Sequence, residues 1–384
     1  MEKPKAPSLW QRAVYRWAAV LTVMSALLLL YTRHPYYLNN MFAPFRPFYI
    51  AAYALWLSLG IFYVRATLLK FKGRRYDMRD GGLHLLIMGK ALWYDRPKFW
   101  RLLKNKRIKT TVLAICVKGF FTPLMTSFLS GHAQSIVNAW AHKKGRAPVQ
   151  LVLQAGNPLE QASAWWMQVK QRVPELLPVA SDFSGLFHPG TWTLADTNWG
   201  LGFVYDIIFF VDCGWALMGY SSESKWLNNK TRSVEPTGFG WIVCIFCYPP
   251  YNNILGTYLP LQNGPAIITD PVWLLVLRAV TVGAFAIYAS ATVAFGFRFS
   301  NLTNRGIVSR GPYRFVRHPA YLTKCFAWWM EHLPTLNPVK AFFLACLCGV
   351  YALRAWTEER HLGQDPDYRA YKKKVPWVFI PGVY

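Results

Sequence analysis

The chain has 384 residues, of which 53% are hydrophobic and 17% aromatic, and its mean hydropathy is positive. One soluble core of this size needs less apolar surface, so the composition excludes an ordinary soluble enzyme and favours a polytopic membrane protein. The net charge of +25 comes from 43 Lys and Arg against 18 Asp and Glu, and in a membrane protein it marks cytoplasmic loops beside anionic lipid rather than a nucleic-acid partner.

Eight apolar runs are long enough, or nearly so, to cross a membrane as helices. The first run resembles a secretory signal, but no small-residue cleavage site follows it, so we expect a retained helix. The last two runs are short, and Pro249 and Pro250 break the fifth. The pattern predicts an all-α integral membrane protein with about eight transmembrane helices. The runs cover residues 17–31, 48–69, 110–130, 201–220, 239–261, 272–297, 320–333 and 340–356.

The distribution of basic residues predicts the orientation. The connections at 70–109 and 298–317 are rich in Lys and Arg, so both are expected in the cytoplasm. Eight spans then leave both termini cytoplasmic, and the poorly charged turns at 262–270 and 335–338 fall on the far side. The membrane is the inner membrane if the protein is bacterial and the endoplasmic reticulum if it is eukaryotic, and the sequence leaves the oligomeric state open.

The connection at 131–200 is predicted to lie outside in spite of its basic residues, because long loops follow the charge rule weakly. Within it, 157–173 has the pattern of a helix, with Asn157 as cap and Pro158 at the first helical position. Its apolar residues recur at spacings of three and four. Two uses stay open: a lid on the bilayer or the spans, or a helix that packs on its own loop.

Two regions of different function are predicted. Residues 1–200 form an N-terminal membrane region with a basic loop and the amphipathic helix, as a lid or substrate region. Residues 201–384 form the enzyme core. The seven cysteines are odd in number and lie mostly in apolar runs, so no disulfide framework is expected. Cys244 and Cys247 have CxxC spacing without a second pair nearby, and no metal site is expected.

Two polar stretches of the core are predicted to meet. GPYRFVRHPAYLTK at 311–324 precedes an apolar run, and TEERHL at 357–362 follows the next one. The 39 residues between His318 and Glu358 consist of an apolar helix, a proline-bearing turn and a second apolar helix. Such a hairpin returns the chain to the side from which it left, and the tail after 362 stays polar enough to fold over the turn.

The meeting point combines cations, carboxylates and aromatic rings at the mouth of the membrane. Such a set suits a zwitterionic ligand with a flat ring: cations for a carboxylate, a glutamate for an ammonium or ribose hydroxyls, and an aromatic wall for a base. S-adenosylmethionine has all of these groups. The residues concerned are Arg314, Arg317, His318, Glu358, Glu359, Tyr313, Tyr321 and Tyr368.

The same stretches resemble a known family. GPYRFVRHPAYL, then RAWTEERHL, DYRAY and VPWVFIP, are similar to the C-terminal signature of the isoprenylcysteine carboxyl methyltransferase superfamily, which also holds membrane phospholipid N-methyltransferases. The resemblance covers 271–384. It implies a helical membrane methyltransferase that binds S-adenosylmethionine between 311–324 and 354–384. The cofactor residues that it implies are Tyr313, Arg317, His318, Pro319, Tyr321, Glu358 and Glu359.

Two details qualify the resemblance. Adjacent helical residues point about 100° apart, so one glutamate is expected to face the cofactor while the other pairs locally, with Arg354 or Arg360. The small residue expected after the His-Pro-x-Tyr turn is Thr323 here. A bulkier residue there could keep backbone and ligand apart.

The sequence therefore predicts an integral membrane methyltransferase that uses S-adenosylmethionine and acts on a lipid or lipidated substrate. Two alternatives stay open: a membrane reductase of the sterol-reductase type that uses NADPH, and a non-catalytic lipid-binding scaffold. The catalytic residues and the methyl acceptor stay unassigned. Ionisable residues inside the spans are candidates for a base or an orienting group, namely Lys118, Asp206, Asp212, Arg278, Glu331 and His332.

Overall fold

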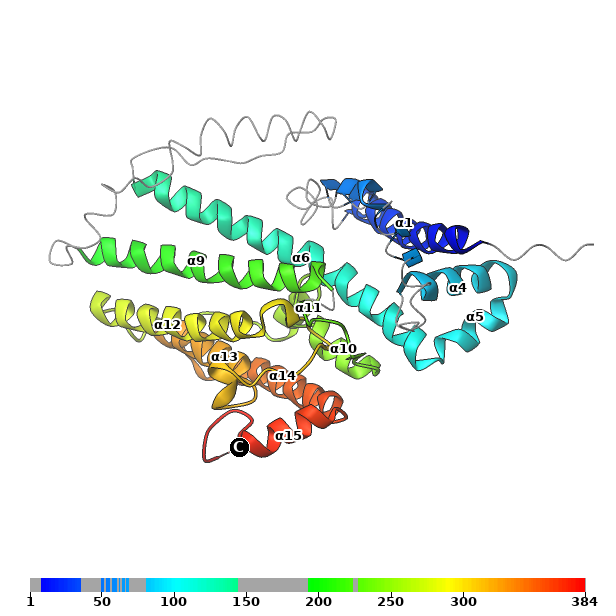
Figure 1. Ribbon diagram of the computed structural model, residues 1–384. Coiled ribbons are helices and arrows are strands. Elements are labelled where there is room, and N and C mark those ends of the chain that lie inside the picture. The colour runs from blue at the N-terminus through cyan, green and yellow to red at the C-terminus, as the bar shows by residue number, and fades with distance from the viewer. Residues whose placement is uncertain are drawn as a thin grey trace, which may run out of the picture. The chain divides into compact units, whose positions relative to one another are not determined.

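The computed structural model forms two compact units, Met1–Pro123 and Leu124–Tyr384 (Figure 1). The predicted helix at 157–173 lies outside the residues that the structure describes. The functional boundary predicted at residue 200 stays a prediction. The described residues are 8–35, 50–68 in part, 81–143, 193–223 and 227–383.

The first unit contains helices that begin at recognisable caps. Helix α1 begins after Ser8, whose hydroxyl and backbone amide exchange hydrogen bonds with Gln11 in a capping box. Near its end, the hydroxyl of Tyr31 donates to the carbonyl of Gly119. The helices of this unit whose first and last residues are described are α1 (Leu9–Arg33), α4 (Gly81–Tyr94), α5 (Arg96–Leu103) and the first part of α6 (Lys106–Lys143).

The second unit is a helical assembly in which α12 packs against both α9 and α13, while α14 packs against α13 and α10 (Figure 1). Short 3-10 turns join the helices: η4 (Gly296–Arg298), η5 (Gly311–Arg314) and η6 (Leu333–Thr335). The helices are α9 (Leu194–Ser221), α10 (Gly238–Ile245), α11 (Tyr251–Tyr258), α12 (Pro271–Phe295), α13 (Pro319–His332), α14 (Pro338–Leu362) and α15 (Pro366–Lys374).

Among the described residues, five helices are long and apolar enough to cross a membrane. The prediction of a mostly helical chain with several candidate membrane spans is confirmed, whereas the predicted number of eight spans is not reached among these residues. The run at 48–69 lies partly outside the described residues. The sidedness of the termini stays a prediction. The five helices are Leu9–Tyr31, Lys106–Lys143, Leu194–Ser221, Pro271–Arg298 and Pro338–Leu362.

Two of the predicted spans are too short as helices. The run at 239–261 is divided into α10 and α11, because Pro249 and Pro250 supply no amide to continue the first helix. Helix α13 has 14 residues, or about 21 Å at the rise of an α-helix, against a hydrocarbon core of about 30 Å. The hairpin of α13 and α14 therefore has one short and one long arm.

Two other helices are longer than predicted. Helix α6 continues from Lys106 to Lys143, so the predicted loop at 131–200 begins later than expected. The polar residues after 130 still allow a helix, since α6 and α9 pair through His132 Nδ1 and Asp206 Oδ1 at 2.9 Å. Helix α14 runs on to Leu362 and carries both glutamates of the TEERHL stretch.

A small ribbon of two strands interrupts the helical architecture. β1 (Ser233–Val234) pairs antiparallel with β2 (Thr303–Asn304), with Ser233 opposite Asn304. The sequence predicted helices alone and this ribbon was missed, because a strand of two residues is too short to show an alternation of apolar and polar side chains. The connection before β2 lies directly on α9: a Cβ at Gly219 would stand 2.3 Å from the carbonyl oxygen of Phe299, so only glycine permits this approach.

Candidate cofactor site

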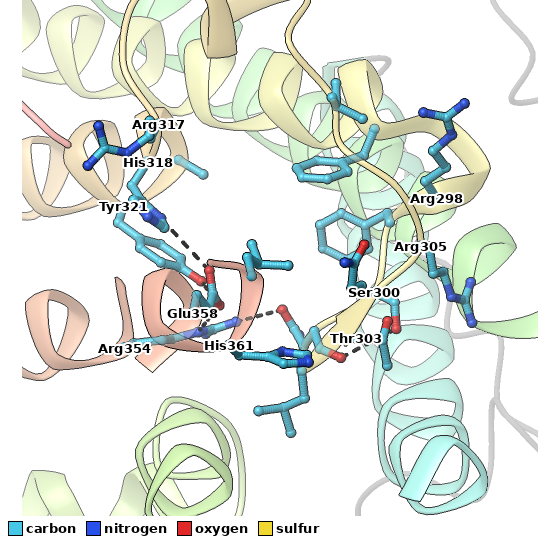
Figure 2. A pocket seen from close by; sticks show the side chains of 18 of the residues that line it. Arg298, Ser300, Thr303, Arg305, Arg317, His318, Tyr321, Arg354, Glu358 and His361 are labelled. Atoms are coloured by element: carbon cyan, nitrogen blue, oxygen red, sulfur yellow. Dashed lines mark hydrogen bonds and ion pairs between the residues drawn. The ribbon is translucent and has the colours of Figure 1, made fainter. Parts of the chain in front are cut away.

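A cavity lies between α12, the 298–308 connection, η5, α13 and α14. Figure 2 shows the His-Pro turn on one side of it and the 298–305 stretch on the other. Five of the seven residues implied by the resemblance line this cavity, and Pro319 and Glu359 do not. The five are Tyr313, Arg317, His318, Tyr321 and Glu358.

The C-terminal tail pairs with the turn through its backbone. The amide of Arg317 donates to the carbonyl of Trp377 at 2.9 Å, and the amide of His318 donates to the carbonyl of Val378 at 3.0 Å. The guanidinium of Arg317 adds hydrogen bonds to the carbonyls of Val375, at 2.9 Å, and Pro376. The predicted folding of the tail over the turn is therefore what the structure contains.

Glu359 anchors this tail. One of its oxygens accepts from Arg317 Nε at 2.6 Å, from the hydroxyl of Tyr368 at 2.5 Å and from His318 Nε2 at 3.2 Å, and the other lies 3.1 Å from Lys372 Nζ. The side chains of Arg317 and Glu359 are only 3% and 12% exposed. We call Arg317, Glu359, Tyr368 and Lys372 the tail clamp.

Glu358 faces the cavity instead. Its Oε1 accepts a short hydrogen bond from the hydroxyl of Tyr321 and lies 3.4 Å from Arg354 Nε, while Oε2 lies 3.8 Å from His318 Nδ1. The ring of His318 stacks on that of Tyr321, with centroids 5.5 Å apart. The Glu358 side chain is 25% exposed, about twice as much as that of Glu359, so it keeps the room to receive a ligand.

The local pairing of the glutamates differs from the expectation. Arg354 pairs with Glu358, one helical turn along α14, and also donates to Asn301 Oδ1 at 2.5 Å. Arg360 pairs with Glu235 at 2.9 Å. Glu359 takes Arg317 as its partner, because the turn of α14 between adjacent residues directs it toward the tail rather than along its own helix.

Tyr313 and Pro319 are held in the frame of the site. Tyr313 packs edge-on against Phe295, with centroids 4.8 Å apart, and its carbonyl accepts from the hydroxyl of Tyr371 at 2.6 Å. Burial raises the pKa of Tyr371, so its hydroxyl stays protonated and able to donate. Pro319 occupies the first position of α13 and is buried. There its missing amide costs no helical hydrogen bond.

The region that contains the turn and both glutamates matches the model of the isoprenylcysteine carboxyl methyltransferase (ICMT) family over residues 272–364. These residues form an ICMT family domain. The resemblance read from the motifs is therefore confirmed for this part of the chain. No curated protein matches the chain, and no solved structure matches it.

Thr323, the departure from the family pattern, leaves the cavity of the ICMT domain clear. Its hydroxyl donates to the carbonyl of Pro319 at 2.9 Å, one turn back on α13, and its side chain is absent from the cavity lining. The effect of Thr323 on the approach of a ligand to the backbone stays a prediction. The next residue, Lys324, does line the cavity.

Part of the cavity wall comes from outside the ICMT domain, and sequence reasoning missed it. Glu235 and Tyr248 line the side reached by Asn301 and His361. Asn301 Nδ2 donates to the hydroxyl of Tyr248 at 3.0 Å, and Ser233 Oγ lies 2.9 Å from His361 Nε2. These partners are separated by 53 and 128 positions, so no local spacing links them in the sequence.

An acidic pair fixes the start of α15 beside the strand ribbon. Arg232 Nη1 lies 3.1 Å from Asp365 Oδ2 and 2.6 Å from Asp367 Oδ2, and Asn304 Nδ2 donates to Asp365 at 2.6 Å. Burial alone would raise the pKa of Asp365, but the hydrogen bonds from Asn304, from the amide of Asp367 and from Arg232 lower it by more. Asp365 is therefore a stable carboxylate that orients the tail.

Proposed function

We propose that the protein is an integral membrane methyltransferase that binds S-adenosylmethionine in the cavity between the His-Pro turn and α14 and methylates a lipid or lipidated acceptor. The carrying observation is that Glu358, His318 and Tyr321 converge on one cavity within a region that matches the ICMT family. The apolar helices around that cavity favour an acceptor with a hydrophobic tail that arrives from the bilayer.

The donor set fits this cofactor chemically. The Oε2 of Glu358 lies 3.8 Å from His318 Nδ1, beyond hydrogen-bond distance, and a carboxylate oxygen placed in this way suits an ammonium or ribose hydroxyls. His318 lies beside it as a donor for the cofactor's carboxylate, and the ring of Tyr313 supplies an aromatic wall. Arg317 supports the site indirectly, since its guanidinium points away from the cavity (Figure 2) and donates to Glu359 and to the carbonyl of Val375.

The cofactor, when bound, supplies a methyl group on a positively charged sulfur. The residues of the chain then have two tasks: to hold the methyl in line with the acceptor and to keep water out. The tail clamp, by covering the His-Pro turn, serves the second task. An acceptor that already carries a negative charge needs no general base. No residue of the chain is therefore assigned as a catalytic base.

Isothermal titration of the purified protein in lipid nanodiscs tests the proposal. S-adenosylmethionine and its demethylated product should bind with dissociation constants in the micromolar range, about −8 kcal/mol. Radiolabelled methyl groups should then pass to a lipid fraction of membranes from the native host. Binding of NADPH with no binding of S-adenosylmethionine would support the reductase instead, and binding of neither would support the lipid-binding scaffold.

A further inference from the structure

The wall of the cavity formed by α13 contains a lysine in an aromatic box. Lys324 Nζ lies 5.5 Å from the ring centroid of Tyr288, 5.4 Å from that of Trp328 and 5.3 Å from that of Tyr351. These rings come from α12, α13 and α14. Tyr288, Lys324 and Tyr351 all line the cavity.

This lysine is displaced along α13 from the groups proposed to hold the cofactor. It follows His318 by six positions, about 9 Å along α13 at the rise of an α-helix. The groups suited to the charged parts of the cofactor, His318 and Glu358, lie at the start of α13 and near the end of α14. Lys324 lies further along α13, which leaves it free to contact the acceptor rather than the cofactor.

The charge of Lys324 is only partly compensated. Among the described residues it has no ion pair within 4 Å, and the aromatic box offers only ring faces. Asp212 is the nearby acid and Arg354 the nearby cation. Asp212 is 6% exposed, and its Oδ1 has no hydrogen-bond partner among the described residues. A buried ammonium held by ring faces is a receptor for an oxyanion, because an anionic ligand recovers the solvation that burial removed.

We propose that Lys324 determines acceptor specificity by pairing with an anionic oxygen group at the end of an apolar tail. This inference rests on the proposed methyl transfer. In that reaction an acceptor oxygen forms a bond to the methyl carbon, the carbon–sulfur bond breaks, and its electron pair stays on sulfur as a neutral thioether. An oxyanion reacts without loss of a proton. A protonated amine would first have to lose one, and Lys324 repels it.

The surroundings of Lys324 also indicate that its ammonium serves acceptor specificity rather than the stability of the fold. Two buried cations of this unit are surrounded by oxygen acceptors instead: Arg317 has Glu359 and two carbonyls, and Lys340 Nζ donates to Asn263 Oδ1 and Thr335 Oγ1 at 2.9 and 2.7 Å. Lys324, in contrast, has ring faces around it and the cavity in front of it.

Competition binding in nanodiscs tests this assignment with matched probes. The probes are N-acetyl-S-farnesylcysteine, its carboxamide, hexadecyl phosphate and hexadecylamine. We expect the wild-type protein to prefer the carboxylate over its carboxamide by tenfold or more, and Lys324→Met to bring that ratio close to one. Lys324→Arg should retain a preference, and Lys373→Met, which removes an exposed lysine of α15, should change nothing. Hexadecyl phosphate shows whether the oxyanion can be a phosphate.

The affinity for S-adenosylmethionine separates this inference from the proposed function. It should stay within twofold of wild type in Lys324→Met. A large loss of cofactor affinity in that variant, a retained carboxylate preference, or a wild-type preference for hexadecylamine would each overturn the role of Lys324 while leaving methyl transfer standing. Failure of the wild-type protein to bind S-adenosylmethionine would instead overturn the proposed function.

Discussion

The two ends of the α13–α14 hairpin use charged residues in opposite ways. At the far turn, Lys340 is 1% exposed and its ammonium is enclosed by Asn263 and Thr335. At the other end, Glu358 faces the cavity, whereas the oxygens of Glu359 accept from the other three residues of the tail clamp. A charge whose hydrogen-bonding capacity is filled by the fold fixes geometry, and one left partly unfilled is available to a ligand.

The largest effect is expected from a substitution that opens the tail clamp. Arg317→Met leaves Glu359 buried without its main partner, a change that typically costs about 3–5 kcal/mol. The amide of His318, which donates to Val378, should then exchange hydrogen at least about a hundredfold faster, since 1.4 kcal/mol corresponds to a factor of ten. Arg369→Met, an exposed arginine of α15, serves as the control. Unchanged exchange in Arg317→Met would mean that the clamp does not hold the tail.

The adjacent glutamates offer the next test. Glu358→Gln should weaken binding of S-adenosylmethionine by about 1.5–3 kcal/mol, the scale of a hydrogen bond to a charged group, with little change in the exchange of the His318 amide. Glu359→Gln should do the reverse and release the tail. Titration calorimetry and hydrogen exchange on the same two proteins decide the matter. Equal effects of both variants on both measurements would contradict the assignment of Glu358 to the cofactor and of Glu359 to the tail.

At the far turn the expected effect is smaller and purely structural. Lys340→Met removes two hydrogen bonds but also the cost of a buried charge, so a net loss of about 1–2 kcal/mol is expected. Faster exchange of the amides of Gly264 and Ile267, which donate to the carbonyls of Thr335 and Pro334, would report it. Affinity for S-adenosylmethionine should stay at the wild-type value, and a clear loss there would show that the far turn supports the site.

The smallest effect concerns acid stability at the start of α15. Because the fold lowers the pKa of Asp365, its contribution is present above its usual pKa, about 4. That contribution is lost as the pH falls from there through the lowered value. The Arg232–Asp365 ion pair is partly exposed, so it contributes less than about 1 kcal/mol to the free energy of unfolding. Melting temperatures of wild type and Asp365→Asn should differ at pH 6 and converge below pH 4, and a constant difference would refute the assignment.

The arrangement of the hairpin motifs could be predicted from the sequence because it depends on spacing along the chain. Helical spacing predicted that Glu358 and Glu359 would point in different directions. The apolar runs on either side of Pro334 and Pro338 predicted that the His-Pro turn and the glutamates would meet. The family resemblance rested on the same stretches and was confirmed over 272–364.

By itself, then, the sequence determined that the chain is a helical membrane protein with an ICMT domain, because composition, helical period and motif order are properties of the chain alone. Tertiary structure decided which glutamate faces the cavity and that Glu235, Tyr248 and Asn301 complete its wall. It also decided that Lys324 meets rings from three helices. Apart from the Lys324–Trp328 contact within α13, those contacts join residues tens of positions apart, and which of many possible partners a side chain takes depends on how the helices pack.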